Sequence, residues 1–167
     1  LVEDLKSQEV IIGVSLFGSW SRGDAVQGSD IDLLIVDKRD IDYEYNERIE
    51  FDNLIVDLNY IPGKWITRRV PPEIEQKIYE SKILYDRTGG LTRICNWMRK
   101  NYWTHERVDL RTESYLMDAY TYLSRATSAI NKDDLESTAI YAAIGLESIL
   151  KTLIEVNMLP ISNTHFI

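Results

Sequence analysis

The sequence predicts an α/β (α+β) protein in which a small mixed β-sheet domain is followed by a helical bundle. Two observations support this fold class. Short apolar runs of strand length, separated by turn residues, fill the first half of the chain. From Leu91 onward, apolar residues recur every three or four positions, which is the period of an amphipathic helix. Thr88-Gly89-Gly90 separates the two patterns, so we place a sheet domain at residues 1–88 and a helical domain at residues 91–167.

The elements of the sheet domain follow from apolar runs and turn residues. Val10 to Phe17 is almost continuously apolar, as in a buried strand. Asp52-Asn53 lies between two partly alternating runs, and both residue types tolerate a positive φ, so we expect a hairpin there. The predicted order is helix 1–8, strand 10–17, turn-rich connection 20–29 with a short helix at its start, strand 31–36, strand 47–51, strand 54–61, short helix 64–70, helix 73–81 and strand 83–85.

Three helices are expected in the second domain. They are recognised by apolar residues at helical spacing, by Asp133-Asp134 before the third helix and by Pro160 after it. The apolar residues that mark them are Leu91, Ile94, Cys95, Met98 and Tyr102, then Leu116, Ala119, Tyr120, Leu123, Ala126 and Ile130, then Leu135, Ala139, Ala142, Leu146, Ile149, Leu150 and Leu153. Gly145 in the third helix allows a second helix to approach closely.

Composition favours a cytoplasmic globular protein. The chain is 44% hydrophobic and 28% charged, and no apolar run approaches the length of a membrane span. No charged-then-apolar leader opens the sequence, and the single cysteine, Cys95, fits a reducing compartment. The chain starts at Leu1 rather than methionine and stops at Ile167 just after a helix-like stretch, which fits a fragment with a truncated helical domain.

The charge distribution argues against nucleic acid as a partner. Net charge is −8, and residues 1–90 hold 18 acidic and 11 basic residues. Because phosphate contacts dominate non-specific binding, an acidic chain without a basic stripe binds nucleic acid poorly. We interpret most of the acidic excess as solvated surface charge and the remainder as available to a divalent cation.

Residues 14–36, VSLFGSWSRGDAVQGSDIDLLIV, carry the strongest chemical signal. An apolar strand runs into Gly18-Ser19, and a second strand opens with Asp30 and Asp32. Side chains alternate along a strand, so these two carboxylates point the same way and repel each other unless a cation lies between them. Mg²⁺ prefers such oxygen ligands and often keeps phosphates in its other positions. The Gly-Ser turn brings backbone and a hydroxyl close to a phosphate, so we predict a site for a metal-bound nucleoside triphosphate.

Asp57 supplies a third carboxylate. It lies in the middle of the predicted strand LIVDLNYI, between Val56 and Leu58, which point to the opposite face. A charge at the centre of an otherwise buried strand is costly unless it is paired or bound to metal. We therefore expect Asp57 to be paired with an opposite charge or bound to a metal ion.

This order of motifs resembles the nucleotidyltransferase superfamily related to DNA polymerase beta. Its features are Gly-Ser, ten residues, Asp-hydrophobic-Asp, and a carboxylate on a later strand. The string GSWSRGDAVQGSDIDLLIV is similar to the small prokaryotic members, the minimal and kanamycin-type enzymes, which commonly carry Gly-Ser-x-x-Arg-Gly and then Ser-Asp-x-Asp-Leu. The similarity covers the first 60 residues, and residues 83–86 also resemble the end of such domains.

The resemblance implies that Asp30, Asp32 and Asp57 are the catalytic residues and bind one or two Mg²⁺ ions. In the family, the third carboxylate is a metal ligand, a general base or both. Physical chemistry agrees, because two metals held by shared carboxylates stabilise both the attacking and the leaving oxygen.

The resemblance also implies a set of nucleotide-binding residues. Gly18 and Ser19 would hold the β and γ phosphates of ATP or another nucleoside triphosphate. Ser29 would support the loop before the first carboxylate. Arg22 would meet a phosphate or a nearby carboxylate.

The implied function is Mg²⁺-dependent transfer of a nucleoside monophosphate, AMP from ATP, to a hydroxyl acceptor. The acceptor stays open between a small molecule such as an aminoglycoside and a protein side chain, as in antitoxin-type enzymes that adenylylate a HEPN partner. We expect the helical domain to shape the acceptor site and to form a homodimer interface. The alternative is a non-catalytic module that keeps the fold and binds a partner, with or without nucleotide.

Glu147 and Lys151 lie four residues apart in the third predicted helix. One interpretation is an ordinary i, i+4 ion pair. The other follows from kanamycin-type enzymes, whose helical domain supplies a glutamate as general base with a lysine nearby. Both stay open. The two histidines, His105 and His165, lie far from the motif, and we assign them no role.

Overall fold

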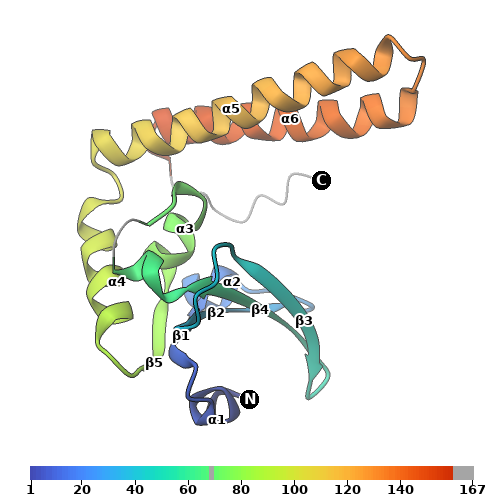
Figure 1. Ribbon diagram of the computed structural model, residues 1–167. Coiled ribbons are helices and arrows are strands. Elements are labelled where there is room, and N and C mark those ends of the chain that lie inside the picture. The colour runs from blue at the N-terminus through green and yellow to red at the C-terminus, as the bar shows by residue number, and fades with distance from the viewer. Residues whose placement is uncertain (68–69, 160–167) are drawn as a thin grey trace. The chain divides into compact units, whose positions relative to one another are not determined.

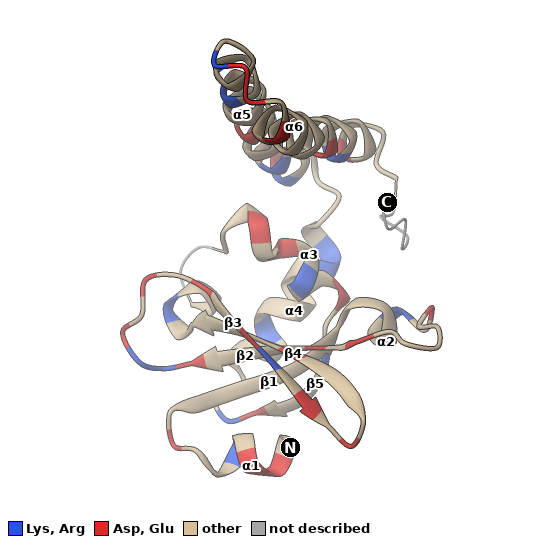
Figure 2. Ribbon diagram, turned by 90° about the vertical axis from the view of Figure 1, so that its right-hand side faces the viewer, with Lys and Arg blue, Asp and Glu red and all other residues tan. Residues whose placement is uncertain are grey.

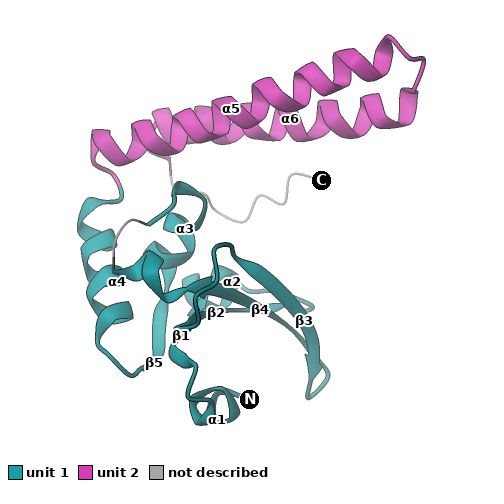
Figure 3. Ribbon diagram, in the orientation of Figure 1, with its two compact units in different colours: residues 1–102 teal, residues 103–167 magenta. Residues whose placement is uncertain are grey.

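The computed structural model describes residues 1–67 and 70–159 (Figure 1). The chain divides into two compact units, residues 1–102 and residues 103–167, which are described separately (Figure 3). His165, the end of the predicted 91–167 domain and part of the predicted 64–70 helix lie outside the described residues.

A five-stranded mixed sheet forms the centre of the first unit. Its strand order is β3-β4-β2-β1-β5, in which β2 and β4 are parallel and the other neighbours are antiparallel. The bounds are β1 Ile11–Phe17, β2 Ile31–Asp37, β3 Tyr45–Phe51, β4 Leu54–Pro62 and β5 Lys82–Asp86. This sheet, together with the helices that follow it, confirms the predicted fold class.

Helices lie on both faces of the sheet. Helix α1 lies on one face, and α3 and α4 lie on the other (Figure 1). The helical elements of this unit are α1 Val2–Ser7, α2 Gly18–Arg22, the 3₁₀-helix η1 Gly63–Ile66, α3 Pro72–Glu80 and α4 Gly90–Asn101. Helix α3 begins at Pro72, one residue before the predicted start at residue 73. Proline suits the first turn because it lacks an N–H that would have no partner at that position.

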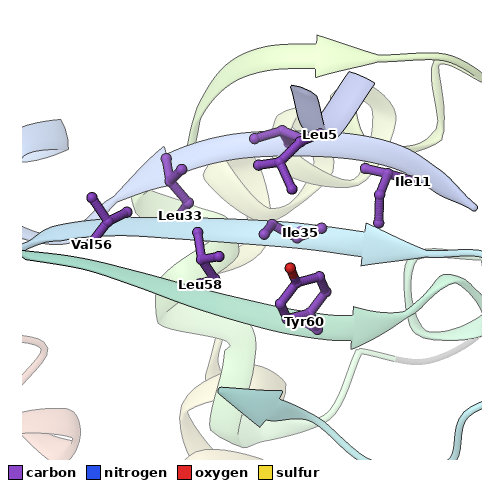
Figure 4. Close-up of a cluster of buried hydrophobic side chains, with 8 residues drawn as sticks. Leu5, Ile11, Leu33, Ile35, Val56, Leu58 and Tyr60 are labelled. Atoms are coloured by element: carbon purple, nitrogen blue, oxygen red, sulfur yellow. The ribbon is translucent and has the colours of Figure 1, made fainter. Parts of the chain in front are cut away.

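The buried cluster beneath α1 fixes which side chains face the opposite way. Leu33 and Ile35 of β2 pack there with Val56 and Leu58 of β4 (Figure 4). Neighbouring residues in a strand point to opposite faces. Asp32 on β2 and Asp57 on β4 therefore point to the face that carries α3.

The predicted hairpin is confirmed. Asp52 and Asn53 both adopt positive φ, at 51° and 61°, as a two-residue turn between right-twisted strands requires. The turn sets the β3–β4 register, in which Arg48 lies opposite Asp57. Residues 20–29 differ in part from the prediction, because α2 starts directly at Gly18 and not after it.

Thr88-Gly89-Gly90 is the start of α4 and not a linker. The Asp86 carboxylate accepts a hydrogen bond from the Thr92 N–H at 2.7 Å, which satisfies a free donor of the first helical turn. A Cβ at Gly13 of β1 would lie 2.9 Å from the Leu91 side chain, so α4 packs directly on the sheet. The compact units therefore divide after residue 102, whereas the sequence placed the domain boundary at residues 88–91.

The second unit contains two long helices, α5 His105–Ile130 and α6 Leu135–Val156, joined by a short turn. Asp134 caps α6 by accepting a hydrogen bond from the Ser137 N–H at 3.0 Å. Gly145 allows the close approach that the sequence suggested, because a Cβ there would lie 2.9 Å from Leu123 of α5. The second and third predicted helices are thus confirmed, and α5 starts eleven residues earlier than the apolar spacing from Leu116 indicated.

Much of the apolar surface of α5 and α6 faces outward. Eleven large apolar side chains of the two helices are exposed, four of them leucines in the second half of α5 or of α6. Exposed apolar surface on this scale is typical of an interface, and the homodimer stays a prediction. None of the helices in the described part of the chain combines the length and apolar composition that a bilayer span requires.

The contact between Gly13 and Leu91 can be tested with a double-mutant cycle. Gly13→Val should lower the free energy of unfolding by about 1–3 kcal/mol, because the new side chain overpacks against α4. Leu91→Ala alone should cost about 2–5 kcal/mol by leaving a cavity. The loss in the double variant should be smaller than the sum of the two single losses, since alanine at position 91 makes room for valine at position 13. Denaturant unfolding measures all four proteins, and strictly additive losses would contradict this packing.

Candidate functional site

Two of the predicted carboxylates lie side by side on neighbouring strands. In the parallel β2–β4 pair, Asp32 is the register partner of Asp57. Asp30 immediately precedes β2, two residues before Asp32 and therefore on the same side of the chain. The structure thus brings Asp30, Asp32 and Asp57 together on the α3 face, close enough that Asp30 and Asp57 both act electrostatically on Asp32.

Asp32 is a carboxylate whose surroundings disfavour its ionised form. Burial raises its pKa to about 6, and the neighbouring Asp30 and Asp57 add to that rise. Lys77 and Arg22 act in the opposite direction without cancelling it. The fold therefore holds a carboxylate whose ionised form is unfavourable in this environment, a feature common in functional sites.

Gly18 fits beneath this carboxylate because it has no side chain. Its φ is +68°, and a Cβ at this position would lie 2.2 Å from Oδ2 of Asp32. Ser19 is buried next to it in the first turn of α2, and its carbonyl accepts from the Gly23 N–H at 2.9 Å, which ends the helix. The predicted Gly-Ser turn therefore lies directly against the predicted carboxylates.

Arg22 and Ser29 organise the connection between α2 and β2. The Arg22 guanidinium donates to Glu80 of α3 at 2.6 Å and to Asp24 at 3.2 Å. The Ser29 hydroxyl accepts from the Val26 N–H at 2.9 Å. Arg22 was expected to meet a phosphate or a nearby carboxylate, and in the structure it binds carboxylates. Contact of Arg22 or Ser29 with a nucleotide stays a prediction.

Arg48 is a site residue that the sequence did not reveal. Its Nε donates to Oδ1 of Asp57 at 2.6 Å, and its Nη2 donates to Oδ2 of Asp57 at 2.5 Å and to Oδ2 of Asp30 at 3.0 Å. This bidentate pair holds the pKa of Asp57 below its usual range. A guanidinium thus lies between two of the three carboxylates. The signal that could have found it is the hairpin register, which places residue 48 opposite residue 57.

Lys77 of α3 is a second residue that the sequence did not reveal. Its ammonium group donates to Oδ1 of Asn59 at 3.1 Å and pairs with Glu44 at 3.1 Å. It also lowers the pKa of Asp32. No sequence pattern marks it, because its position depends on how α3 packs over the sheet.

A cavity of about 300 Å³ opens over these residues. Its walls come from β2, β3 and β4. The lining residues are Asp32, Asn46, Glu47, Arg48, Asp57 and Asn59. Three carboxylates, those of Asp32, Glu47 and Asp57, therefore line the cavity together with a guanidinium.

The three carboxylates, as they lie in the structure, do not form a complete metal-binding site. Within residues 1–67 and 70–159, no three His, Cys, Asp or Glu side chains are arranged to hold a metal ion as they stand. The donor chemistry nevertheless suits Mg²⁺, since all three side chains offer carboxylate oxygens. The obstacle is Arg48, which engages both oxygens of Asp57.

Glu147 and Lys151 form the ion pair of the first interpretation. Their side chains meet at 2.7 Å on α6, and each is nearly half exposed. A role for Glu147 as general base stays a prediction.

Comparison with known proteins identifies the first unit. The family described as nucleotidyltransferase domain matches residues 1–87, just over half of the chain. This chain belongs to that family. The resemblance to the polymerase beta-like superfamily is confirmed, and family membership supports nucleotidyl transfer in general as the chemistry of the site. No curated protein matches the sequence significantly.

A solved structure extends the similarity to the whole chain. A nucleotidyltransferase-like protein from Exiguobacterium sibiricum superposes with a TM-score of 0.52 and 11% sequence identity. The match covers 98% of this chain and 57% of that protein, so the chain spans little more than half the length of this neighbour. At such low identity the likeness concerns the fold.

The contact of Gly18 with Asp32 can be separated from the general cost of left-handed backbone. Gly18→Ala and Gly28→Ala both place a side chain at positive φ, but a Cβ at Gly28 meets nothing within 4 Å. Both variants should lose about 1–2 kcal/mol of unfolding free energy to backbone strain. Gly18→Ala should lose about 1–3 kcal/mol more, because Asp32 must move. Equal losses in denaturant unfolding would show that the carboxylate does not press on Gly18.

The strain at Asp32 predicts a pH-dependent gain in stability for Asp32→Asn. The folded-state pKa of about 6 exceeds the reference value of 3.8, so the native chain retains the proton longer, and its stability falls as pH rises between these values. Without divalent cations and near pH 8, Asp32→Asn should raise the free energy of unfolding by about 1–2 kcal/mol after allowance for solvent screening.

The comparison requires unfolding curves across the pH range in a chelating buffer. The gain should vanish below about pH 4, where both the folded and the unfolded wild-type chain carry a protonated Asp32. Asp118→Asn, an isosteric change at an exposed position of α5, is the control and should change little. A loss of stability in Asp32→Asn near pH 8 would contradict the assigned strain.

Proposed function

We propose that this protein transfers a nucleoside monophosphate, AMP from ATP, to a hydroxyl acceptor in a Mg²⁺-dependent reaction. The observation that carries the proposal is the convergence of Asp30, Asp32 and Asp57 on one face of a nucleotidyltransferase domain. Gly18 lies directly against one of these carboxylates, since a Cβ there would lie 2.2 Å from Oδ2 of Asp32.

The donor chemistry of the three carboxylates suits the metal that the family implies. Asp30, Asp32 and Asp57 would hold Mg²⁺ through carboxylate oxygens, and a positive group, the Arg48 guanidinium, already lies between two of them. When bound, Mg²⁺ would neutralise triphosphate charge and stabilise the attacking and leaving oxygens.

The chain's own residues would position the reactants and move one proton. Backbone at Gly18 and the Ser19 hydroxyl would hold the β and γ phosphates. The acceptor oxygen would form a bond to the α-phosphorus while the bond from that phosphorus to the bridging oxygen breaks, and pyrophosphate would leave. Asp57 would accept the hydroxyl proton, which requires that its pairing with Arg48 loosen, because Arg48 keeps this carboxylate a weak base.

The acceptor is proposed as a hydroxyl of a small molecule or of a protein side chain. Basic residues are dispersed among acidic ones in the ribbon of the first unit (Figure 2). The net charge of −8 also disfavours a polynucleotide acceptor. A non-catalytic module that binds a partner is the second candidate, and nucleotide binding followed by transfer separates it from an enzyme.

The role of Asp57 can be tested with Asp57→Asn. Removing the carboxylate charge should lower the rate of labelled-AMP transfer by at least about a hundredfold, as loss of a general base or metal ligand does. Affinity for ATP with Mg²⁺, measured by calorimetry, should change by less than about tenfold, since Gly18 and Ser19 remain. Asp118→Asn is the matched control and should keep both properties.

Two results would count against the proposal. Wild-type protein that binds no nucleotide in the presence of Mg²⁺ would defeat the enzyme and favour the partner-binding module. Normal transfer by Asp57→Asn would remove the third carboxylate from the catalytic set.

A further inference from the structure

We propose that Arg48 is a built-in counter-ion of the carboxylate site, and that its guanidinium must leave Asp57 and Asp30 before a divalent cation binds there. The proposal rests on the proposed function, because it concerns the metal that the transfer reaction would use. It adds a residue of this chain that controls when the metal enters.

The contacts of Arg48 are those of a cation that occupies a ligand set. Both oxygens of Asp57 accept from it, at 2.6 and 2.5 Å, and Oδ2 of Asp30 accepts at 3.0 Å. A metal ion would need these same oxygen atoms. Two cations held against the same oxygen atoms repel each other, so binding of the two is competitive.

Arg48 is also placed where it can withdraw. It lies on β3, the edge strand of the sheet, and its side chain is 64% exposed. Within the described residues, the hydrogen bonds of its side chain all go to Asp30 and Asp57. Nothing in the core has to move when the guanidinium turns toward solvent, and the long flexible side chain can adopt other rotamers there.

While the guanidinium is bound, the negative charge of the three carboxylates is only partly neutralised. It donates hydrogen bonds to Asp57 and Asp30, and these bonds do not extend to Asp32. A planar guanidinium held by two carboxylates does not relieve the third. A compact divalent cation that contacts all three would, and this difference provides the driving force for exchange.

A purely structural role is the alternative. Arg48 lies directly opposite Asp57 in the β3–β4 hairpin, and cross-strand ion pairs stabilise such pairs of strands. In that case, removing Arg48 would weaken the hairpin and leave metal affinity unchanged or lower. The two roles therefore predict different signs for the change in metal affinity.

Mn²⁺ binding without nucleotide tests the proposal. Free Mn²⁺ is measured by its electron paramagnetic resonance signal during titration of wild type, Arg48→Ala, Arg48→Lys and Arg39→Ala. Arg48→Ala should bind Mn²⁺ roughly tenfold more tightly than wild type, the equivalent of one lost charge-assisted hydrogen-bonded pair. Arg48→Lys should fall between them, because lysine keeps the charge without the bidentate fork.

Arg39→Ala is the matched control. Arg39 pairs through its side chain with Asp37 at the far end of β2, so it shares the chemistry of Arg48 but not the site. Its loss should leave Mn²⁺ affinity unchanged. Equal gains in Arg39→Ala and Arg48→Ala would reflect the general loss of positive charge and would overturn the proposal.

A measurement on wild-type protein guards against misfolded variants. Nitrogen-15 NMR should show a protected Nε–H signal for Arg48 while it is paired, and saturating Mg²⁺ should shift or remove that signal. A signal that is unchanged when Mg²⁺ is bound would overturn the proposal.

The outcomes separate this proposal from the proposed function. If wild type transfers AMP but Arg48→Ala binds Mn²⁺ no more tightly than wild type, only the role of Arg48 is wrong. If neither protein binds Mn²⁺ and wild type binds no nucleotide, the proposed function fails and the role of Arg48 fails with it.

Discussion

The contact between the Asp32 carboxylate and the backbone at Gly18 determines the arrangement of the site. It arises because Phe17, the last residue of β1, is the register partner of Asp32 on β2. The chain must then turn away in a left-handed conformation without a side chain, since a Cβ at Gly18 would lie 2.2 Å from the carboxylate oxygen. The turn predicted to bind phosphate and the Asp32 carboxylate are therefore the two sides of one packing contact.

Apolar packing on the opposite face of the sheet stabilises this contact. Leu33, Ile35 and Val56 are almost fully buried beneath α1. A register slip of one residue would exchange these apolar side chains with Asp32 and its neighbours, at a large cost in buried charge. The core therefore fixes the alternation that gathers the acids on the other face. Strain of this kind is common in functional sites, where the surrounding fold offsets it.

The sequence was sufficient for the strands and for the carboxylates, because alternation and turn residues are local signals. The two-residue turn at Asp52-Asn53 also sets residue 48 opposite residue 57, so the hairpin register is the local signal that places Arg48 at the site. Lys77 is different, because its place near Asp32 depends on the packing of α3. The Gly89-Gly90 pair marks loops and helix starts equally well, and only the burial of Leu91 against Gly13 decides between them.

The charges of the site also constrain what can bind. Three cations that act on the site are already engaged by the protein's own groups: Arg48 by Asp57 and Asp30, Lys77 by Glu44 and Asn59, and Arg22 by Glu80 and Asp24. A bare triphosphate would bring its negative charge to three carboxylates, and none of these three cations is free to receive it. A triphosphate that arrives with its own cation avoids this repulsion, and the same cation relieves Asp32. If the proposed function holds, the arrangement therefore favours a triphosphate accompanied by a divalent cation over a bare one.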